Sequence, residues 1–473
     1  MLPDDVLIAI FLAILDEYGD NINEYEIAAS MKAWQTLVHV CRRWRSIVFG
    51  SPRHLNVRLV CTDRTPASDT LVVWPALPLI IRSRGYLIES VDNIVVVLER
   101  SNHVHQIDLD GISILHSETV LAAMQVPFPE LTNLRLIPLL DTSDDLRVLP
   151  DSFLGGSAPR LQTLCLLGIP FPGLPKLLLS ATHLRRLCLY GIPRFGYISP
   201  EAMVTALSTM TSLDTLCIRF QSSQSFPDMA SRRPSAPKPF VLPVLIEFEF
   251  EGVSEYLDDL MAHIEAPRLF SLCIKFFNQT LFGSQPLVRF ISRIPGLKAP
   301  EEAYLAFGGS SALVRLSSPT TESNLVVTIG GNLVLELSCR GLDQISSLKQ
   351  VCTSCLLPLD RSVENLFIYG SSFWEADRPD NVENSLWLEL LQRFTAVKNL
   401  YLYQEFVQRI GPALQELVEA RMPEVLPCLR NIFLTNFQTS TPIQEGIQQF
   451  VSSRQASYPI EISRWNMEFD YDD

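Results

Sequence analysis

Basic residues are scarce in this chain of 473 residues: 38 Lys and Arg stand against 52 Asp and Glu, for a formal net charge of -14. Nucleic-acid binding needs clustered Lys and Arg that release counterions from phosphates, so we expect no nucleic-acid partner. Long apolar runs are also missing, and none approaches the length of a membrane-spanning helix, so we expect no membrane partner. An acidic surface favours solubility and protein partners.

A secretory leader is not indicated. The apolar run from Val6 to Leu15 resembles one, but Asp4 and Asp5 precede it where a basic region would stand. The ten cysteines do not indicate disulfides, because four of them share one position of a repeated frame and fit there as small apolar residues: Cys165, Cys188, Cys217 and Cys273. The composition predicts a reducing compartment, the cytoplasm and/or the nucleus.

Sequence motifs of common catalytic sites are missing too, since there is no Gly-rich phosphate loop, GxSxG elbow or HExxH helix. Cys352 and Cys355 form the only CxxC, share a helical face with Leu348, and have no second pair at zinc spacing, so we interpret them as core residues. His103 and His105 lack further ligands and are predicted to lie at the surface. We therefore expect no enzyme, no cofactor and no metal, and a redox or metal enzyme would rest on the cysteines alone.

What the chain does have is a repeated six-residue frame, apolar at positions one, four and six, best seen in the segment from Leu161 to Leu166. Further copies are Val104-Ile107-Leu109, Leu131-Leu134-Leu136, Leu184-Leu187-Leu189, Leu213-Leu216-Ile218, Leu245-Phe248-Phe250, Leu269-Leu272-Ile274, Val363-Leu366-Ile368, Val397-Leu400-Leu402 and Leu429-Ile432-Leu434. Two weaker copies lie around Leu305-Phe307 and Leu333-Leu337. The copies are roughly 23 to 34 residues apart, enough for one strand, a turn and one return helix.

This spacing predicts an α/β fold, in which an irregular leucine-rich-repeat solenoid over residues 56–462 has a curved parallel sheet and helices on its convex side. Val57 to Cys61 and Leu77 to Ile81 should form the first strands, and Val91 to Glu99 the first return helix. The Asn or Cys usual three places after position six is replaced by Ile169, Ile192 or Gln221, so we expect no Asn ladder. Residues 221–239 are predicted to be an exposed loop, and 463–473 an acidic tail.

The residue between positions four and six of each frame is predicted to face outward, on the concave side. That row reads Asp108, Arg135, Cys165, Cys188, Cys217, Glu249, Cys273, Phe367, Tyr401 and Phe433. The next outward positions add Tyr369 and Tyr403, so aromatic side chains should gather near the C-terminal end. Our candidate substrate-binding residues are Phe367, Tyr369, Tyr401, Tyr403 and Phe433. Alternatively, a C-terminal loop or the tail from Trp465 covers them and makes a satellite core.

The N-terminal residues 1–55 are predicted to be a helical module with an acidic insert. A helix from about residue 3 to 15 is apolar nearly all round, which implies burial on two sides, one of them against a partner. Leu37, Val40, Cys41, Trp44 and Val48 have helical spacing and predict a second helix that ends at Gly50. The acidic connector from Asp16 to Glu26 lacks the ligand spacing of a calcium loop and is predicted to be a solvated loop.

The segments Leu2-Pro-Asp-Asp-Val-Leu7, Ile10-Phe11 and Val40-Cys-Arg-Arg-Trp-Arg45 together resemble an F-box, with a long insert between about Asp16 and Ala33. Segments such as Trp34-Gln-Thr-Leu-Val38, Trp387-Leu-Glu-Leu-Leu391 and Ala396-Val-Lys-Asn-Leu-Tyr-Leu402 resemble the expanded F-box and leucine-rich-repeat proteins of mushroom-forming (basidiomycete) fungi. The resemblance implies docking on a Skp-type adaptor of a cullin-RING (SCF-type) ubiquitin ligase. The residues implied to make or support the adaptor contacts are Pro3, Leu7, Ile10, Phe11, Val40, Cys41, Arg42 and Trp44.

Two functions therefore compete. In the first, the chain is the substrate-recognition subunit of such a ligase, and the repeats hold an unknown protein substrate. In the second, it is a repeat scaffold whose N-terminal helices only cap the open end of the solenoid and which has no degradative role. A helix that is apolar on two sides favours docking over capping.

Overall fold

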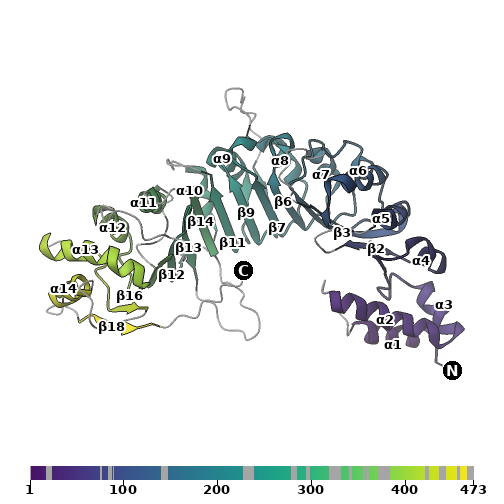
Figure 1. Ribbon diagram of the computed structural model, residues 1–473, viewed down its shortest axis with the longest axis horizontal. Coiled ribbons are helices and arrows are strands. Elements are labelled where there is room, and N and C mark those ends of the chain that lie inside the picture. Colours follow the sequence, from purple (N-terminus) through teal and green to yellow (C-terminus); the bar gives the residue numbers. More distant parts are fainter. Residues whose placement is uncertain are drawn as a thin grey trace. The chain divides into compact units, whose positions relative to one another are not determined.

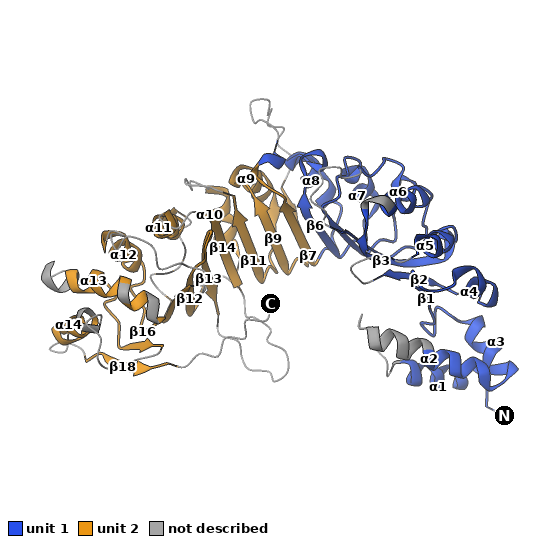
Figure 2. Cartoon of the chain, in the orientation of Figure 1, with its two compact units in different colours: residues 1–213, 224–233 blue, residues 214–223, 234–473 orange. Residues whose placement is uncertain are grey.

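The structure is a computed structural model of the chain. It describes residues 2–16, 24–74, 77–83, 88, 90–139, 148–226, 239–277, 285–294, 299–318, 332–339, 343–354, 357, 359, 362–370, 384–420, 425–435, 444–454 and 459–465. The chain divides into two compact units, Met1–Leu213 with Gln224–Arg233, and Asp214–Ser223 with Pro234–Asp473 (Figure 2). No helix among the described residues is long and apolar enough to cross a membrane.

The described residues of unit 1 form three N-terminal helices, five further helices and six parallel strands. Its helices are α1 (Asp4–Asp16), α2 (Glu24–Val40), α3 (Arg42–Gly50), α4 (Ala67–Val73), α5 (Val91–Leu98), α6 (Ile114–Ala123), α7 (Leu174–Ser180) and α8 (Pro200–Leu207), with 3-10 turns η1 (Ser101–His103), η2 (Phe153–Gly156) and η3 (Arg194–Gly196). Its strands are β1 (Leu59–Cys61), β2 (Leu79–Ser83), β3 (Val104–Ile112), β4 (Asn133–Pro138), β5 (Thr163–Leu167) and β6 (Arg186–Ile192). They pair in chain order, each parallel to the next.

Unit 2 continues the same strand-and-helix alternation. Its strands are β7 (Thr215–Phe220), β9 (Glu247–Gly252), β11 (Ser271–Phe276), β12 (Glu302–Phe307), β13 (Ser311–Ser317), β14 (Asn332–Ser338), β15 (Asn365–Gly370), β16 (Asn399–Leu402), β17 (Asn431–Leu434) and β18 (Glu461–Arg464). Its helices are α9 (Ser254–Met261), α10 (Gln285–Arg293), α11 (Gln344–Ser354), α12 (Asn384–Leu391), α13 (Gln404–Ala420) and α14 (Gln444–Arg454). The turn η4 (Ser223–Ser225) follows β7, and β8 (Phe240–Val241) pairs separately with β10 (Ile264–Glu265).

The repeated frame forms the strands as predicted. In the copy that begins at Leu161, the side chains of positions one, four and six are all buried, and the same holds in the other nine strong copies. These positions point toward the helices, which lie along one face of each unit's sheet (Figure 1). Phe307 of β12, for example, contacts Trp387 of α12 and Phe406 of α13. We call the opposite face of each sheet the open face. The predicted first strands and the return helix α5 are also present.

The sheet of unit 2 is not purely parallel, contrary to our prediction. Its order is β7-β9-β11-β14-β13-β12-β15-β16-β17-β18, and β13 runs antiparallel to both neighbours. Gly308 and Gly309 follow β12, and the Gly308 amide donates to the Ser311 carbonyl at 2.7 Å, which closes a hairpin between β12 and β13. Glycine pairs between two alternating apolar segments are typical hairpin turns. The two weak frames therefore lie in β12 and β14, the outer strands of a three-stranded antiparallel element whose middle strand is β13.

The second N-terminal helix is also not continuous. Cys41 has an extended backbone, with φ -160° and ψ 168°, and separates α2 from α3. In addition, α2 begins at Glu24, so the later part of the predicted acidic loop is helical, while residues 17–23 lie outside the described residues. The helical spacing across Cys41 was real on each side, but it belongs to two helices whose axes change direction there. The predicted loop at 221–239 is described only at residues 221–226 and 239.

Candidate functional site

Helix α1 has two apolar sides with different environments. Leu7 and Phe11 are buried against the other N-terminal helices, and the Phe11 ring meets the half-buried Trp44 ring edge-on, with centroids 4.8 Å apart. Val6, Ile10 and Ile14, spaced four residues apart, remain 37%, 39% and 38% exposed. We call Leu2, Val6, Ile10 and Ile14 the exposed α1 row. One side of the helix therefore packs on its own chain, and the other meets solvent.

Most of the remaining residues implied by the F-box resemblance are exposed. Pro3, Cys41 and Arg42 are exposed, and Val40 at the end of α2 is 56% exposed. Arg43 holds α3 to the start of α1, because its Nη2 donates to Asp4 Oδ1 and to the Leu2 carbonyl, each at 2.5 Å. Of the candidate adaptor contacts, five are thus at the surface, while Leu7, Phe11 and Trp44 support the surface from behind.

The N-terminal helices are also joined to the first repeat. Trp34 of α2 is buried and meets Trp74, which follows α4, with ring centroids 5.3 Å apart, and Phe49 of α3 meets Trp74 at 5.6 Å. This aromatic contact covers the start of the repeats. The same helices therefore cap unit 1 and still present the exposed α1 row.

The predicted outward row is confirmed by the strand register. In unit 1, Asp108 pairs with Arg135, then Cys165 and Cys188. In unit 2, Cys217 pairs with Glu249 and then Cys273, and the row continues through Val334 and Arg315. It then reaches Tyr304, Phe367, Tyr401 and Phe433. The repeated frame therefore predicted correctly which residue of each strand lies in this row.

Four aromatic rings stack on the open face of unit 2. Successive centroids from Tyr304 to Phe367, Tyr401 and Phe433 are 4.5, 4.3 and 4.5 Å apart, with interplanar angles of 8°, 12° and 9°. On the next outward row, Tyr369 and Tyr403 lie 6.0 Å apart. All of these side chains are half-buried. The structure therefore brings together all five candidate substrate-binding residues and adds Tyr304, which lies in a weak frame copy where Ala303 stands in position four.

Trp465, the residue that follows the edge strand β18, joins this cluster. Its ring lies 5.8 Å from Phe367, 5.0 Å from Tyr401 and 6.0 Å from Tyr403. Its backbone amide donates to the Leu434 carbonyl at 2.9 Å, which keeps it in the strand ladder. The indole thus covers part of the cluster, as in the alternative that we considered, while Phe367, Tyr401 and Tyr403 stay half-buried; residues 466–473 lie outside the described residues. We define the aromatic cluster as Tyr304, Phe367, Tyr369, Tyr401, Tyr403, Phe433 and Trp465.

An Asn ladder lies at position three of the last frames, a different place from the turns where we predicted none. Asn399 Nδ2 donates to Asn365 Oδ1 and Asn431 Nδ2 donates to Asn399 Oδ1, both at 2.7 Å. We looked for it three places after position six, where the chain has apolar or other residues. The ladder lies on the open face beside the ring stack, because Asn365, Phe367 and Tyr369 alternate with buried residues of β15.

Charged groups on the open face of unit 2 are mostly paired. Arg219 pairs with Glu249, and Lys275 lies 3.4 Å from Glu251 and 3.7 Å from Glu336. Tyr304 Oη donates to Glu302 Oε2 at 2.7 Å, and the Arg315 guanidinium lies 5.4 Å from the Tyr304 ring. Burial and this hydrogen bond raise the pKa of the Tyr304 hydroxyl. Burial, with the nearby Glu302 charge, also raises the pKa of Tyr401.

The thiols of the outward row are less accessible than their facing implies. Cys165, Cys188 and Cys217 are buried, because a small side chain between larger neighbours is shaded by them. Burial raises the pKa of Cys273 to about 11. Cys352 is buried on α11, and Cys355 lies outside the described residues. No group of three or more His, Cys, Asp or Glu among the described residues could hold a metal ion.

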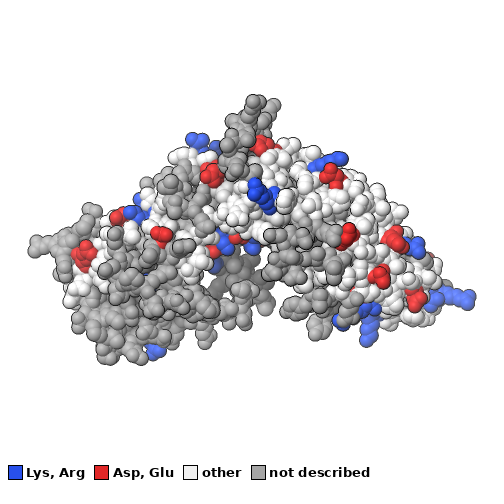
Figure 3. Space-filling model, turned by 45° about the horizontal axis from the view of Figure 1, so that its top comes forward, with Lys and Arg blue, Asp and Glu red and all other residues white. Residues whose placement is uncertain are grey.

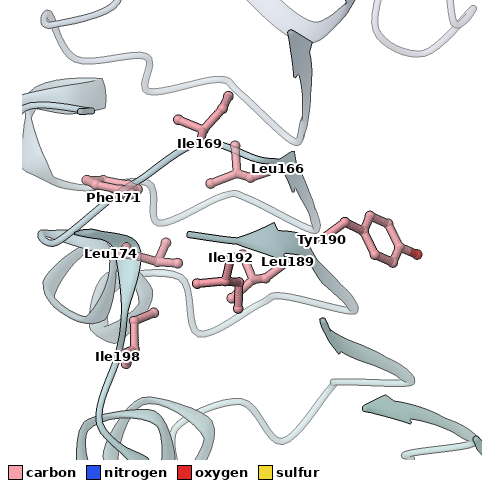
Figure 4. Close-up of a pocket in the computed structure, with 9 residues that line it drawn as sticks. Leu166, Ile169, Phe171, Leu174, Leu189, Tyr190, Ile192 and Ile198 are labelled. Atoms are coloured by element: carbon pink, nitrogen blue, oxygen red, sulfur yellow. The ribbon is translucent and has the colours of Figure 1, made fainter. Parts of the chain in front are cut away.

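Unit 1 contains a small pocket behind β5 and β6. Leu166, Ile169, Phe171, Leu174 and Ile192 are among its lining side chains, whereas the Tyr190 ring points away from it (Figure 4). Its volume of about 10 Å³ is close to the minimum for one water molecule. The pocket is a packing defect between repeats and is too small for a ligand.

Lys, Arg, Asp and Glu side chains are interspersed on the described surface in Figure 3.

The two sequence-predicted histidines have separate environments. His103 is exposed, while His105 is half-buried and its Nδ1 lies 3.0 Å from Thr132 Oγ1. Burial, and then the charge of Arg58, lower the pKa of His105, so this ring is neutral near pH 7.

Comparison with known proteins identifies no family. No protein-family profile matches the sequence, and no curated protein is similar to it. One similar solved structure is the leucine-rich repeat-containing protein LegL7 from Legionella pneumophila, with 16% identity, 73% of this chain and 90% of that chain covered, and a TM-score of 0.28. At that score the likeness carries no argument, so the assignment rests on the strands described above. Their parallel pairing, repeated frame and return helices are consistent with a leucine-rich-repeat solenoid, and such a fold suggests a protein-interaction repeat protein.

Proposed function

We propose that the chain is the substrate-recognition subunit of an SCF-type ubiquitin ligase. In this proposal the exposed α1 row, with Val40, Cys41 and Arg42, docks a Skp-type adaptor and through it a cullin-RING ligase. The open face of unit 2 holds a protein substrate in the cytoplasm or nucleus. The chain itself positions the substrate and performs no catalysis, since the transfer chemistry belongs to other subunits.

The observation that carries the proposal is the exposed α1 row. A helix that only capped the repeats would need a single apolar side, and Leu7 and Phe11 already supply it. Val6, Ile10 and Ile14 have no such role in the described part of the chain, because they face solvent. Exposed apolar residues in a continuous row mark an interaction site more often than isolated ones do. The F-box resemblance implies a Skp-type adaptor as the partner, and in the proposal the exposed α1 row is the surface that binds it.

The competing function, a scaffold with capping helices, keeps one observation in its favour. Trp34, Phe49 and Trp74 join the three helices to the first repeat, as a cap requires. This contact does not involve the exposed α1 row, because Trp34 belongs to α2 and Phe49 to α3. The N-terminal helices can therefore both cap the repeats and dock an adaptor. The adaptor experiment distinguishes this case from helices that only cap the repeats.

The experiment is co-purification of a Skp-type adaptor with the full chain and with the double variant Val6→Glu, Ile10→Glu. Each apolar side chain contributes up to about 1.5–3 kcal/mol when fully buried, and burial of a carboxylate adds a penalty. We expect adaptor recovery to fall at least about tenfold, with unchanged circular dichroism. The matched control, Thr36→Glu on the exposed side of α2, should retain binding. Adaptor recovery at the wild-type level by the folded double variant would leave only the capping role.

The buried residues Leu7 and Phe11 serve as a separate control. Charged substitutions there should unfold the helices, since both side chains are buried and Phe11 supports Trp44. Loss of adaptor binding in such variants would not distinguish docking from folding.

A further inference from the structure

The ring stack presents its edges, and not its faces, to a partner. Its four rings are nearly parallel and face one another across β12, β15, β16 and β17, so the solvent-facing atoms are ring edges and tyrosine hydroxyls. Ring edges carry partial positive charge and attract the negative face of another aromatic ring. The cluster is therefore shaped for an aromatic side chain that lies across it.

Trp465 shows this mode of contact within the chain. Its ring meets Tyr401 at an interplanar angle of 62° and Tyr403 at 88°. It directly follows β18, which lies at the edge of the sheet and buries none of its four side chains. An element with few buried apolar contacts opens at low cost. The indole is thus a loosely anchored occupant of a position that another aromatic side chain can take.

Arg315 lies beside Tyr304, the ring at the β12 end of the stack. The Arg315 guanidinium lies over the Tyr304 ring, and within the described ranges it has no carboxylate at ion-pair distance, while its Nε is buried without an acceptor. By contrast, Arg219 and Lys275 on the same face are paired with glutamates. Because Nε is buried, a partner carboxylate would reach this half-buried guanidinium through its other nitrogens, and a guanidinium without an ion pair favours such a carboxylate.

The distances between these groups set the spacing of a ligand. The ring centroids of Trp465 and Phe367 lie 5.8 Å apart, and those of Phe367 and Tyr304 lie 4.5 Å apart. The Arg315 guanidinium carbon lies 5.4 Å from the Tyr304 centroid, so the indole and the guanidinium lie at most about 16 Å apart. An extended chain advances about 3.3–3.6 Å per residue and places residues i and i+4 on one side, about 13–14 Å apart. That spacing lies within this upper limit.

We propose that the aromatic cluster binds an extended segment of a partner protein that carries an aromatic side chain and, four residues away, an acidic one. The aromatic side chain replaces Trp465, and the carboxylate binds Arg315. This inference rests on the proposed function only in taking the open face of unit 2 as the recognition surface. It gives the partner a chemical class: an acidic segment with an exposed aromatic residue.

The test uses the full chain and a labelled peptide, acetyl-Gly-Trp-Gly-Ser-Gly-Asp-Gly, with fluorescence anisotropy as the readout. Trp465→Ala should tighten binding about tenfold, because the internal competitor is gone, and Trp465→Phe should lie between it and the wild type. Arg315→Gln should weaken binding about tenfold and remove the difference between the Asp peptide and its Asn version. Arg186→Gln, which removes an exposed cation from unit 1, is the matched control and should change nothing.

Three results would overturn the inference. Equal affinity of wild-type protein for the Asp and Asn peptides would remove the role of Arg315. If a folded Trp465→Ala variant lost peptide binding, the indole would be part of the binding surface and not a competitor for it. Peptide binding only after residues 466–473 are deleted would assign the face to the chain's own C-terminal segment. Adaptor co-purification, measured on the same samples, stays unchanged in each case, so failure here is separate from failure of the proposed function.

Discussion

At the scale of single residues, Tyr304 connects the ring stack to the polar edge of the open face. It was not among our predicted residues, because Ala303 weakens its frame and we placed that copy two residues later, at Leu305-Phe307. Trp465 was considered only as the start of a covering tail. The position rule alone identified five of the seven members of the aromatic cluster, since an alternating strand fixes facing. It could not show that an edge-strand side chain reaches across its neighbours.

The Tyr304 hydroxyl should make stability depend on pH in the alkaline range. The pKa of Tyr304 is raised from its ordinary value of 10.0, so the folded chain holds this proton more tightly than the unfolded one. The contribution is complete below pH 10 and is lost as the pH rises toward the folded-state pKa. Tyr304→Phe should lower the free energy of unfolding by about 1 kcal/mol at pH 7 and flatten the loss above pH 10.

Urea unfolding at pH 7 and at pH 10.5 measures both effects of Tyr304→Phe. If the free energy of unfolding changes by the same amount between these two pH values in the variant and in the wild type, the titration of Tyr304 is not linked to folding.

The thiols give a second residue-scale prediction. Burial raises the pKa of both Cys61 and Cys273 to about 11, whereas Cys41 and Cys428 are exposed. The thiolate is the species that reacts. With iodoacetamide at pH 8, peptide mass spectrometry should therefore show Cys41 and Cys428 modified first, and Cys61 and Cys273 only after unfolding. Early modification of Cys273 would mean that its strand is more open than described.

At the scale of elements, the strands followed from the frame, but the places where the chain leaves the repeat did not. The hairpin of β12 and β13 has a sequence signal in Gly308-Gly309, which we missed because the strand before it matched a weak repeat. The break at Cys41 has no such signal, since helical spacing continues on both sides of it. The Asn ladder was missed because side chains at position three are fixed by cross-strand pairing, which becomes visible only once the register is known.

The Asn ladder should stabilise the last strands of unit 2. Asn399 makes side-chain hydrogen bonds to both neighbours, so Asn399→Ala removes two of them and should lower the free energy of unfolding by about 1–2 kcal/mol. Asn133 occupies the same frame position in β4, and no side-chain hydrogen bond is recorded for it among the described residues. Asn133→Ala is therefore the matched control. Equal losses in thermal unfolding would show that the ladder contributes nothing beyond the strand position.

At the scale of the whole molecule, the chain separates two surfaces of different chemistry into two compact units. Unit 1 presents the exposed α1 row, which is aliphatic, and unit 2 presents the aromatic cluster. Strand alternation predicted which residues line the open face of unit 2. For α1 the sequence predicted two apolar sides but not which of them faces solvent, since Leu7 and Phe11 are buried while Val6 and Ile14 are exposed. It did not predict the division into two units, which depends on contacts between residues far apart in the chain.

The measurement that tests the account most directly is proximity labelling in the native host with three forms of the chain. We expect Val6→Glu, Ile10→Glu to lose labelling of the Skp-type adaptor and cullin while other partners persist. Tyr401→Ala, Tyr403→Ala should keep the adaptor and lose at least one other protein partner, because the ring stack is broken. If both variants recover the wild-type set of proteins, or if both lose the same set while folded, the chain does not join an adaptor and a substrate through separate surfaces.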